Sequence, residues 1–230
     1  MCGRYVPPPP GAMDRIWHFD RALDRGTSTP LYNVAPTRQV PIIVRAADGA
    51  LELNSARWGL IPAWWKQPTP PSLTFNARSE EARHKPSWRQ SLLQQRCLMP
   101  ACGWYEWNEH EPVTNSNGRS VNQPYYIHPR NHEIIAFAGL WSLWQRPGAE
   151  PVLSCALLSR EAAPAIAGIH HRMPVVVQPG DYDSWLAAGT SAAQVDAIMA
   201  SPVTDFEAYR VSLKVNNARN EGPELLEPIG

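Results

Sequence analysis

The stretch Ile134-Ile135-Ala136-Phe137-Ala138-Gly139-Leu140-Trp141 is the longest apolar run in the chain. The run is too short to cross a bilayer, which takes about 20 apolar residues in a helix, and it is predicted to form a strand. The fold is therefore predicted to be rich in β-structure, and no membrane association is expected.

Further segments on both sides of this run also have the apolar or aromatic composition of strands. They are residues 40–44, 51–58, 97–99, 104–107, 124–128, 152–158 and 175–177. Asp48-Gly49 separates the first two of these segments and predicts a β-hairpin. We expect mostly antiparallel, partly closed sheets.

The helices are predicted to be short and peripheral. A first helix ending by Gly26 is predicted from apolar residues that share one side, although Asp20 interrupts that side: Met13, Ile16, Trp17 and Leu23. A polar helical stretch over residues 79–95 is broken at Pro86, because proline cannot continue a helix.

Two more helices are expected near the C-terminus. One begins at Asp181, and Ser191 with Gln194 three residues later fits the capping box of another. Between the elements, residues 59–73 form a proline-interrupted loop, and the polar residues 108–123 are expected to be the most flexible loop. Without a repeat or a composition break, residues 1–230 are predicted to form a single α+β domain.

The overall charge argues against broad attraction to nucleic acid or membrane. Lys+Arg and Asp+Glu both number 21 in 230 residues, so any site for a polyanion must be local. No cationic segment followed by an apolar run opens the chain, and we expect a cytoplasmic monomer.

The cysteines are predicted to be free thiols. In the cytoplasm, Cys2, Cys97, Cys102 and Cys155 are not expected to form disulfides. The spacing of Cys97 and Cys102 matches no common zinc motif, even with His170 or His171 as further ligands. We predict neither a metal nor a cofactor.

Cys2 is the first candidate for chemistry. Removal of Met1 exposes a 1,2-aminothiol, whose amine can condense with an aldehyde and whose thiol can then close a thiazolidine ring. An α-amino group has a pKa of about 7.7 to 8.0, so a useful fraction is neutral at physiological pH. By itself, a cysteine in second position is also compatible with chance.

Glu106 is the candidate acid or base. It lies within Gly103-Trp104-Tyr105-Glu106-Trp107, and enclosure by aromatic side chains would raise the pKa of its carboxyl toward neutrality. Strand alternation allows the other arrangement, in which Glu106 faces solvent.

The segment Ile169-His170-His171-Arg172-Met173-Pro174 adds imidazoles for proton transfer and a guanidinium that can bind phosphate. Adjacent histidines also occur in exposed loops that have no catalytic role. Among ten tryptophans, Trp64 and Trp65 lie in a proline-containing loop and could stack on bases or pack into the core.

Several motifs in order along nearly the whole chain resemble the SOS response-associated peptidase (SRAP) family. They are Met1-Cys2-Gly3-Arg4, Tyr32-Asn33-Val34-Ala35-Pro36, Trp58-Gly59-Leu60-Ile61-Pro62, Asn76-Ala77-Arg78, residues 103–107, Ala138-Gly139-Leu140-Trp141, residues 169–174 and Val215-Asn216-Asn217.

The resemblance implies a β-rich SRAP fold and a thiazolidine crosslink to abasic sites in single-stranded DNA. It also implies roles in DNA repair and the SOS response, a self-processing peptidase label and a lyase activity at the same site. The protein would then be cytoplasmic and associated with the nucleoid at damage.

The family roles carry over to individual residues of this chain. Cys2 is the implied nucleophile, Asn76 orients its amine or the sugar, Glu106 is an acid/base group, and His170 assists proton transfer. The implied DNA-binding residues are Arg4, Trp64, Trp65, Arg78 and Arg172. Two departures concern neighbouring positions: Cys102 stands where aspartate is common, and Leu158-Ser159 replaces a frequent pair of hydroxyl residues.

Two other functions fit parts of the sequence. Amidotransferases with an N-terminal nucleophile also begin with Cys-Gly after Met1, but they use Asn-Gly and Gly-Asp pairs in the site. Here the pairs are Asn117-Gly118, in a polar loop, and Gly180-Asp181, at a predicted helix start. The remaining alternative is a protein that binds single-stranded DNA without a covalent step.

Overall fold

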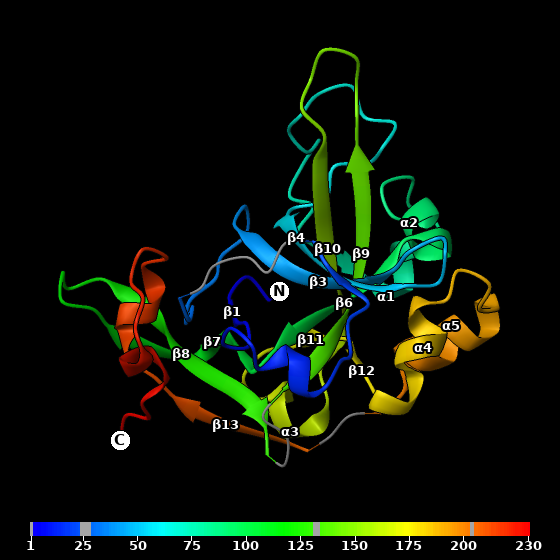
Figure 1. Cartoon of the computed structure of the whole chain (residues 1–230). Helices are drawn as coiled ribbons and strands as arrows, with labels where there is room; N and C mark the ends of the chain where they lie inside the picture. Colours follow the sequence, from blue (N-terminus) through cyan, green and yellow to red (C-terminus); the bar gives the residue numbers. More distant parts are fainter. Residues whose placement is uncertain (1, 24–28, 131–133, 203–204) are drawn as a thin grey trace.

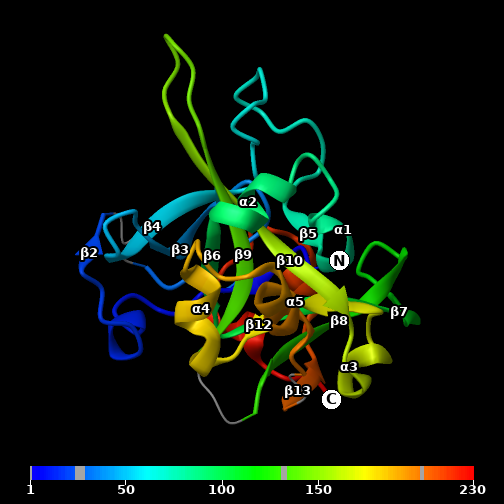
Figure 2. The same cartoon turned by 90° about the vertical axis from the view of Figure 1, so that its right-hand side faces the viewer.

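The computed structural model describes residues 2–23, 29–130, 134–202 and 205–230. Gly26 and Met1 lie outside the described residues. Two sheets dominate the chain, and short helices surround them (Figures 1 and 2). This arrangement confirms the predicted α+β class with mostly antiparallel strands. No helix in the described ranges has the length and apolar character needed to cross a bilayer.

The larger sheet has nine strands and closes partly on itself. Its main path is β11-β10-β4-β3-β6-β9-β12, and β9 also pairs with β10, so that five strands form a closed ring. The strands are β2 (Arg21–Ala22), β3 (Gln39–Arg45), β4 (Leu51–Trp58), β5 (Asn76–Arg78), β6 (Arg96–Ala101), β9 (Ile135–Trp144), β10 (Val152–Glu161), β11 (Arg172–Pro174) and β12 (Val176–Val177).

The predicted apolar run forms most of β9, which lies at the centre of this sheet. β9 pairs with β6, β10 and β12, all antiparallel. Ala138 and Leu140 enter the hydrophobic cluster beneath the helices, whereas Phe137 enters a second cluster on the other face. Both faces of the strand are therefore buried, which explains why its sequence is continuously apolar.

The smaller sheet has the order β1-β7-β8-β13, and all its pairings are antiparallel. Its strands are β1 (Tyr5–Val6), β7 (Gly103–Thr114), β8 (Ser120–Pro129) and β13 (Phe206–Arg210). The prediction of a flexible loop over residues 108–123 is wrong, because most of these residues extend β7 and β8 into a long hairpin. A bulge between Asn108 and Pro112 interrupts the alternation of inward and outward side chains by which a strand is recognised in a sequence.

The helices are short, as predicted. They are α1 (Ser79–Ala82), α2 (Arg89–Gln94), α3 (Pro164–Ala167), α4 (Tyr182–Leu186) and α5 (Ala192–Ala200), with 3₁₀ helices at Met13–Arg15, Pro179–Asp181, Leu213–Asn216 and Pro223–Leu226. Ser191 caps α5 by accepting the Gln194 backbone N–H, but the Gln194 side chain donates to Ser184. Only half of the predicted capping box is therefore formed.

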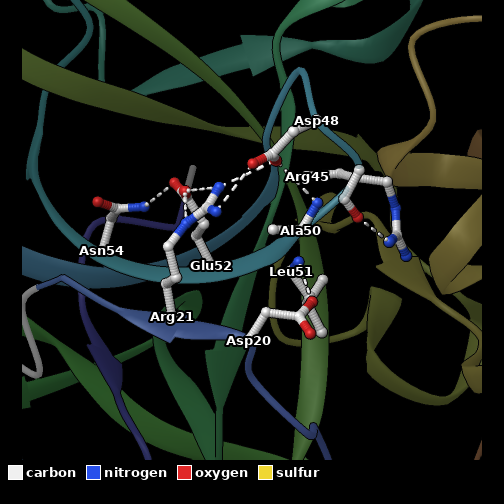
Figure 3. Close-up of polar contacts among 9 residues, drawn as sticks. Asp20, Arg21, Arg45, Asp48, Ala50, Leu51, Glu52 and Asn54 are labelled. Carbon is white, nitrogen blue, oxygen red and sulfur yellow. Dashed lines mark hydrogen bonds and ion pairs between the residues drawn. The ribbon is translucent and has the colours of Figure 1, made fainter.

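The predicted helix between residues 13 and 26 is wrong beyond the 3₁₀ turn at Met13–Arg15. Asp20 exchanges hydrogen bonds with Leu51: its backbone N–H donates to the Leu51 carbonyl, and its carboxylate accepts the Leu51 N–H at 2.7 Å. Arg21 then bonds Asp48 and Glu52, and β2 joins β4 (Figure 3). The Asp20 side chain that interrupted the apolar face thus draws the segment into the sheet.

Arg96, at the start of β6, ties the sheet to two helices. Its guanidinium donates to the carbonyl oxygens of Leu92 and Leu93 in α2, and to those of Trp185 and Ala187 at the end of α4. The side chain is buried and stacks over the Trp185 ring at 5.7 Å. Carbonyl groups at helix C-termini carry partial negative charge, which stabilises this buried cation.

Arg96→Lys should lower the free energy of unfolding by about 3 kcal/mol, because one ammonium cannot reach four carbonyl groups on two helices. Urea unfolding followed by tryptophan fluorescence measures this. Arg89→Lys, at an exposed position of α2, is the matched control and should change stability little. Equal stability of the two variants would show that the Arg96 bonds do not hold the helices in place.

Candidate functional site

Cys2 lies at the start of the smaller sheet, just before β1. Tyr5 and Val6 pair with Trp104 and Gly103 of β7. The Arg4 carbonyl oxygen accepts the Tyr105 backbone N–H at 3.0 Å and the Cys2 thiol at 3.6 Å. Only 1% of the Cys2 surface is exposed. Pairing with β7 therefore brings the candidate nucleophile into the interior.

Asn76 holds Cys2 from the opposite sheet. It is the first residue of β5, which pairs in parallel with β10. Its Nδ2 donates to the Cys2 carbonyl oxygen at 2.6 Å. Among the described residues, its buried Oδ1 has no hydrogen-bond donor. This oxygen is available to accept a bond from an amine or a sugar hydroxyl.

Glu106 is buried, so the alternative in which it faces solvent is wrong. Its exposed fraction is 2%, and burial raises the pKa of its carboxyl to about 8. The carboxyl is therefore mostly protonated at neutral pH. Burial, followed by the nearby Glu106, also raises the pKa of the Cys2 thiol.

His170 approaches Glu106 from the segment between α3 and β11. Its Nε2 lies 3.9 Å from Glu106 Oε2. The Arg172 backbone N–H donates to Nδ1 at 2.9 Å, and the Arg172 carbonyl oxygen lies 3.0 Å from the same nitrogen. A neutral ring can accept the first bond and a ring protonated at Nδ1 can donate the second, so Nδ1 has a partner in either state. Burial lowers the pKa of His170.

These four residues come from four separate segments and form one connected site. Asn76 bonds Cys2, Cys2 interacts electrostatically with Glu106, and Glu106 lies beside His170. The site contains a thiol, a carboxyl group that can donate a proton at neutral pH and an imidazole that can accept one. Such a set can support the addition of a nucleophile to a carbonyl and the transfer of protons that follows.

Two of the predicted DNA-binding arginines, Arg78 and Arg172, differ in how far protein groups already occupy their guanidinium groups. Arg78 is exposed and forms an ion pair with Glu81 at 3.4 Å. Arg172 binds both carboxylate oxygens of Glu80, at 2.8 and 2.9 Å, and one of its terminal nitrogens also donates to the Ser159 carbonyl oxygen. Its planar fork is thus already occupied by a protein carboxylate.

Trp64 and Trp65 lie on the loop beside the arm formed by β9 and β10, which rises from the body (Figure 2). The two rings contact edge to face at 5.7 Å. Trp64 is 49% exposed, whereas the Trp65 indole donates to the Thr69 carbonyl. The Trp144 indole and Arg146 donate to the Trp65 carbonyl oxygen, which ties the loop to the arm. Trp64 is therefore the more available of the two for stacking.

Arg4 has partners that the sequence analysis missed. Its Nη1 donates to the Asn33 side chain at 2.9 Å and to the Val215 carbonyl at 2.7 Å, and its Nη2 donates to the Asn216 carbonyl at 3.3 Å. Asn33 and Asn216 both belong to motifs quoted above, and membership in a motif was the signal that could have pointed to them. The motifs alone could not show that both residues bind Arg4, because all three are far apart in the sequence.

The pairs expected of an amidotransferase lie away from this set of contacts. Asn117-Gly118 is in the turn that joins β7 and β8, and Gly180-Asp181 is in a 3₁₀ helix. Within the part of the chain that the structure describes, neither pair hydrogen-bonds to Cys2. In the same part, no three His, Cys, Asp or Glu residues are placed to hold a metal ion.

Comparison with known proteins identifies the family. The family model for "SOS response associated peptidase (SRAP)" matches residues 1–218. The chain belongs to the SRAP family. Its SRAP relatives include a Bacillus subtilis protein named "Abasic site processing protein YoqW", which is 34% identical over 99% of both chains.

A more distant relative is "Abasic site processing protein HMCES" of Gallus gallus, which is 28% identical over 90% of this chain and 68% of its own. A solved structure from Bordetella bronchiseptica matches with a TM-score of 0.75 at 22% identity, covering 92% of this chain and all of that one. This likeness shows that the two chains share a fold.

Leu158, Ser159 and Cys102, at which departures from the family were expected, have the following surroundings. Leu158 is buried in the core, and the Ser159 hydroxyl lies 3.4 Å from Arg172 Nη2. Cys102 is partly buried next to β7, and its backbone N–H donates to the Val6 carbonyl oxygen.

Glu106→Gln should remove a pH dependence of stability. The carboxyl has a pKa of about 8 when folded, against about 4.3 when unfolded, so the native state holds the extra proton between these values. The contribution of this carboxyl to the free energy of unfolding is largest below the unfolded pKa. Between the two pKa values it falls by about 1.4 kcal/mol for each unit that the pH rises.

Urea unfolding between about pH 5 and about pH 8 measures this effect as the difference between wild type and variant. Wild type should lose stability relative to Glu106→Gln as pH rises. Glu111→Gln is the control: hydrogen bonds from Tyr125 and Arg210 lower the pKa of that carboxyl, so the difference should be flat in this window. Parallel curves for wild type and Glu106→Gln would contradict a buried, protonated Glu106.

Proposed function

We propose that this protein captures abasic sites in single-stranded DNA through a covalent bond to Cys2, in DNA repair and the SOS response. The names of its relatives support abasic-site processing. The observation that carries the proposal is the buried site in which Asn76 bonds Cys2, Glu106 affects the pKa of the Cys2 thiol, and Glu106 lies beside His170. We further propose that it acts as a cytoplasmic monomer on damaged nucleoid DNA.

The reaction begins once Met1 has been removed and the Cys2 amine is free. The neutral amine adds to the aldehyde of the ring-opened sugar, and loss of one water gives an imine. The thiol sulfur then adds to the imine carbon, and the thiol proton moves to the nitrogen. The product is a thiazolidine ring, formed with a net loss of one water, and closure of the ring protects the linkage from hydrolysis.

The pKa values of the site residues fit the proton transfers of this reaction. Protonated Glu106 donates to the oxygen that leaves as water and can then accept a proton from the thiol. The pKa of His170 is lowered by burial, so its neutral ring can accept a proton during sugar-ring opening. Asn76 fixes the Cys2 backbone and, through Oδ1, orients the amine or the sugar.

Two activities implied by the family resemblance share these residues. Self-processing would remove Met1 and generate the reactive amine. A lyase would use the imine, since that intermediate also permits elimination of the phosphate on the 3′ side before the ring closes. Arg4, Arg78 and Arg172 are the proposed phosphate contacts, and Arg172 would have to release Glu80 before it binds a phosphate. Trp64 and Trp65 are the proposed surface for bases.

Cys2→Ala should abolish covalent capture and leave weak, reversible binding to single strands, because it removes the thiol that closes the ring. The measurement is a denaturing gel of protein with an oligonucleotide that carries one abasic site, beside an intact strand, with mass spectrometry of the N-terminus. A stable adduct formed by Cys2→Ala would overturn the thiazolidine mechanism. Ammonia release from glutamine by the wild type would favour the amidotransferase.

Arg78→Ala should weaken reversible binding to single strands and reduce the salt dependence of binding by about 0.7 in logarithmic slope, the value for one lost phosphate contact. Fluorescence anisotropy across a salt series measures both. Arg119→Ala removes the same charge at the turn of the β7–β8 hairpin and is the matched control. Equal slopes for wild type and Arg78→Ala would argue against a phosphate contact at this position.

A further inference from the structure

The C-terminal segment is packed against the strand residues that flank the candidate site. Arg4 and Trp107 are close in sequence to Cys2 and Glu106, respectively. Asn216 contacts both of them: its carbonyl oxygen accepts from Arg4 Nη2, and its Oδ1 accepts from the Trp107 indole N–H at 2.6 Å. The Arg4 guanidinium also lies over the Trp107 ring, at 5.7 Å.

Asn33 connects this segment to Arg4 and is 1% exposed. Its Oδ1 accepts from Arg4 Nη1, and its Nδ2 lies 3.1 to 3.2 Å from the carbonyl oxygens of Val215, Asn217 and Asn220. These partners fix the orientation of the amide, because only the nitrogen can donate to carbonyl groups. Asn33 thus binds the guanidinium with one end and the C-terminal segment with the other.

The bonds to Arg4 leave one edge of its guanidinium available. A guanidinium has five N–H groups. Both on Nη1 are used, by Asn33 and Val215, and one on Nη2 is used by Asn216. The Nε–H and the second Nη2–H remain, and within the described residues neither has a protein acceptor. These two groups form the side-on fork that binds two phosphate oxygens.

We propose that Asn33 and the segment 215–217 are a positioning device that holds the Arg4 guanidinium with its Nε–Nη2 edge available to a phosphate next to the captured sugar. This inference rests on the proposed function for its ligand. A fixed guanidinium loses less conformational freedom on binding than a mobile one, so its orientation contributes to affinity. Arg4 contacts the phosphate, whereas Asn33 acts only through Arg4.

The first test observes Arg4 directly and needs no covalent chemistry. In full-length ¹⁵N-labelled protein, the Nε–H signal of Arg4 is identified by its loss in Arg4→Lys, and its heteronuclear NOE reports mobility. Wild type should give a rigid signal and Asn33→Ala a mobile one. Asn33→Ser, whose hydroxyl can still donate to one carbonyl, is a second variant that disturbs folding less. An Arg4 signal as rigid in the Asn33 variants as in wild type would overturn the proposal.

A matched control separates positioning from general loss of structure. Gln123 is also a buried amide and holds the Val211 carbonyl next to the C-terminal segment, at 2.9 Å, with no hydrogen bond to Arg4. Gln123→Ala should lower the melting temperature and leave the Arg4 signal rigid. A mobile Arg4 in that variant would show that any loosening of this region has the same effect, and would overturn the specific role of Asn33.

The second test is a double-mutant cycle on reversible binding to an intact single strand. Asn33→Ala should weaken binding about tenfold in the wild-type background, as for one poorly oriented charge-assisted hydrogen bond. In the Arg4→Ala background, Asn33→Ala should not weaken binding any further. Equal losses in both backgrounds would show that Asn33 does not act through Arg4. If wild type forms no adduct with an abasic strand, the capture proposal fails, whereas the Arg4 signal still decides the positioning role.

Discussion

A pairing of only two residues, between β1 and β7, is the interaction on which the site depends. It places Cys2, just before β1, next to the strand that carries Glu106, and the Arg4 carbonyl oxygen accepts both the Tyr105 N–H and the Cys2 thiol. Because β1 is so short, contacts other than its backbone pairing with β7 also hold this part of the chain in place. Asn76 of the larger sheet bonds Cys2 just before the strand, and Asn33 and the C-terminal segment bond the Arg4 side chain. The site therefore forms only where both sheets and the C-terminus meet.

Burial at this meeting point sets the protonation of the site as a whole. The same desolvation that raises the pKa of Glu106 and of the Cys2 thiol lowers that of His170, so all three groups are predominantly neutral near pH 7. A neutral carboxyl can donate a proton, and a neutral imidazole can accept one. The thiol is a poor nucleophile while protonated, so it needs a base close by, and Glu106 is able to take that role once it has given up its own proton.

The sequence predicted elements that rest on local patterns and missed those that depend on distant partners. The apolar run of β9 and the hairpin at Asp48-Gly49 were confirmed, because burial on both faces and turn chemistry can be read locally. The helix after Met13 failed because Asp20 bonds Leu51, far along the chain. The hairpin over residues 108–123 was missed because its polar strands contain a bulge. For Glu106, both orientations fitted its own segment, and its burial beside His170 decided between them.

The arginines near the site help to explain why a covalent step would be useful in SRAP chemistry of this kind. The chain has equal numbers of acidic and basic residues, so long-range attraction contributes little. Arg172 is held by Glu80, and Arg4 spends three of its N–H groups on protein acceptors. The N–H groups that remain for the proposed phosphate contacts are few, and salt weakens any such contact. Reversible binding through so few contacts would be short-lived, whereas a thiazolidine forms only where the strand carries an aldehyde. Retention and selectivity for the lesion would then come from the same bond.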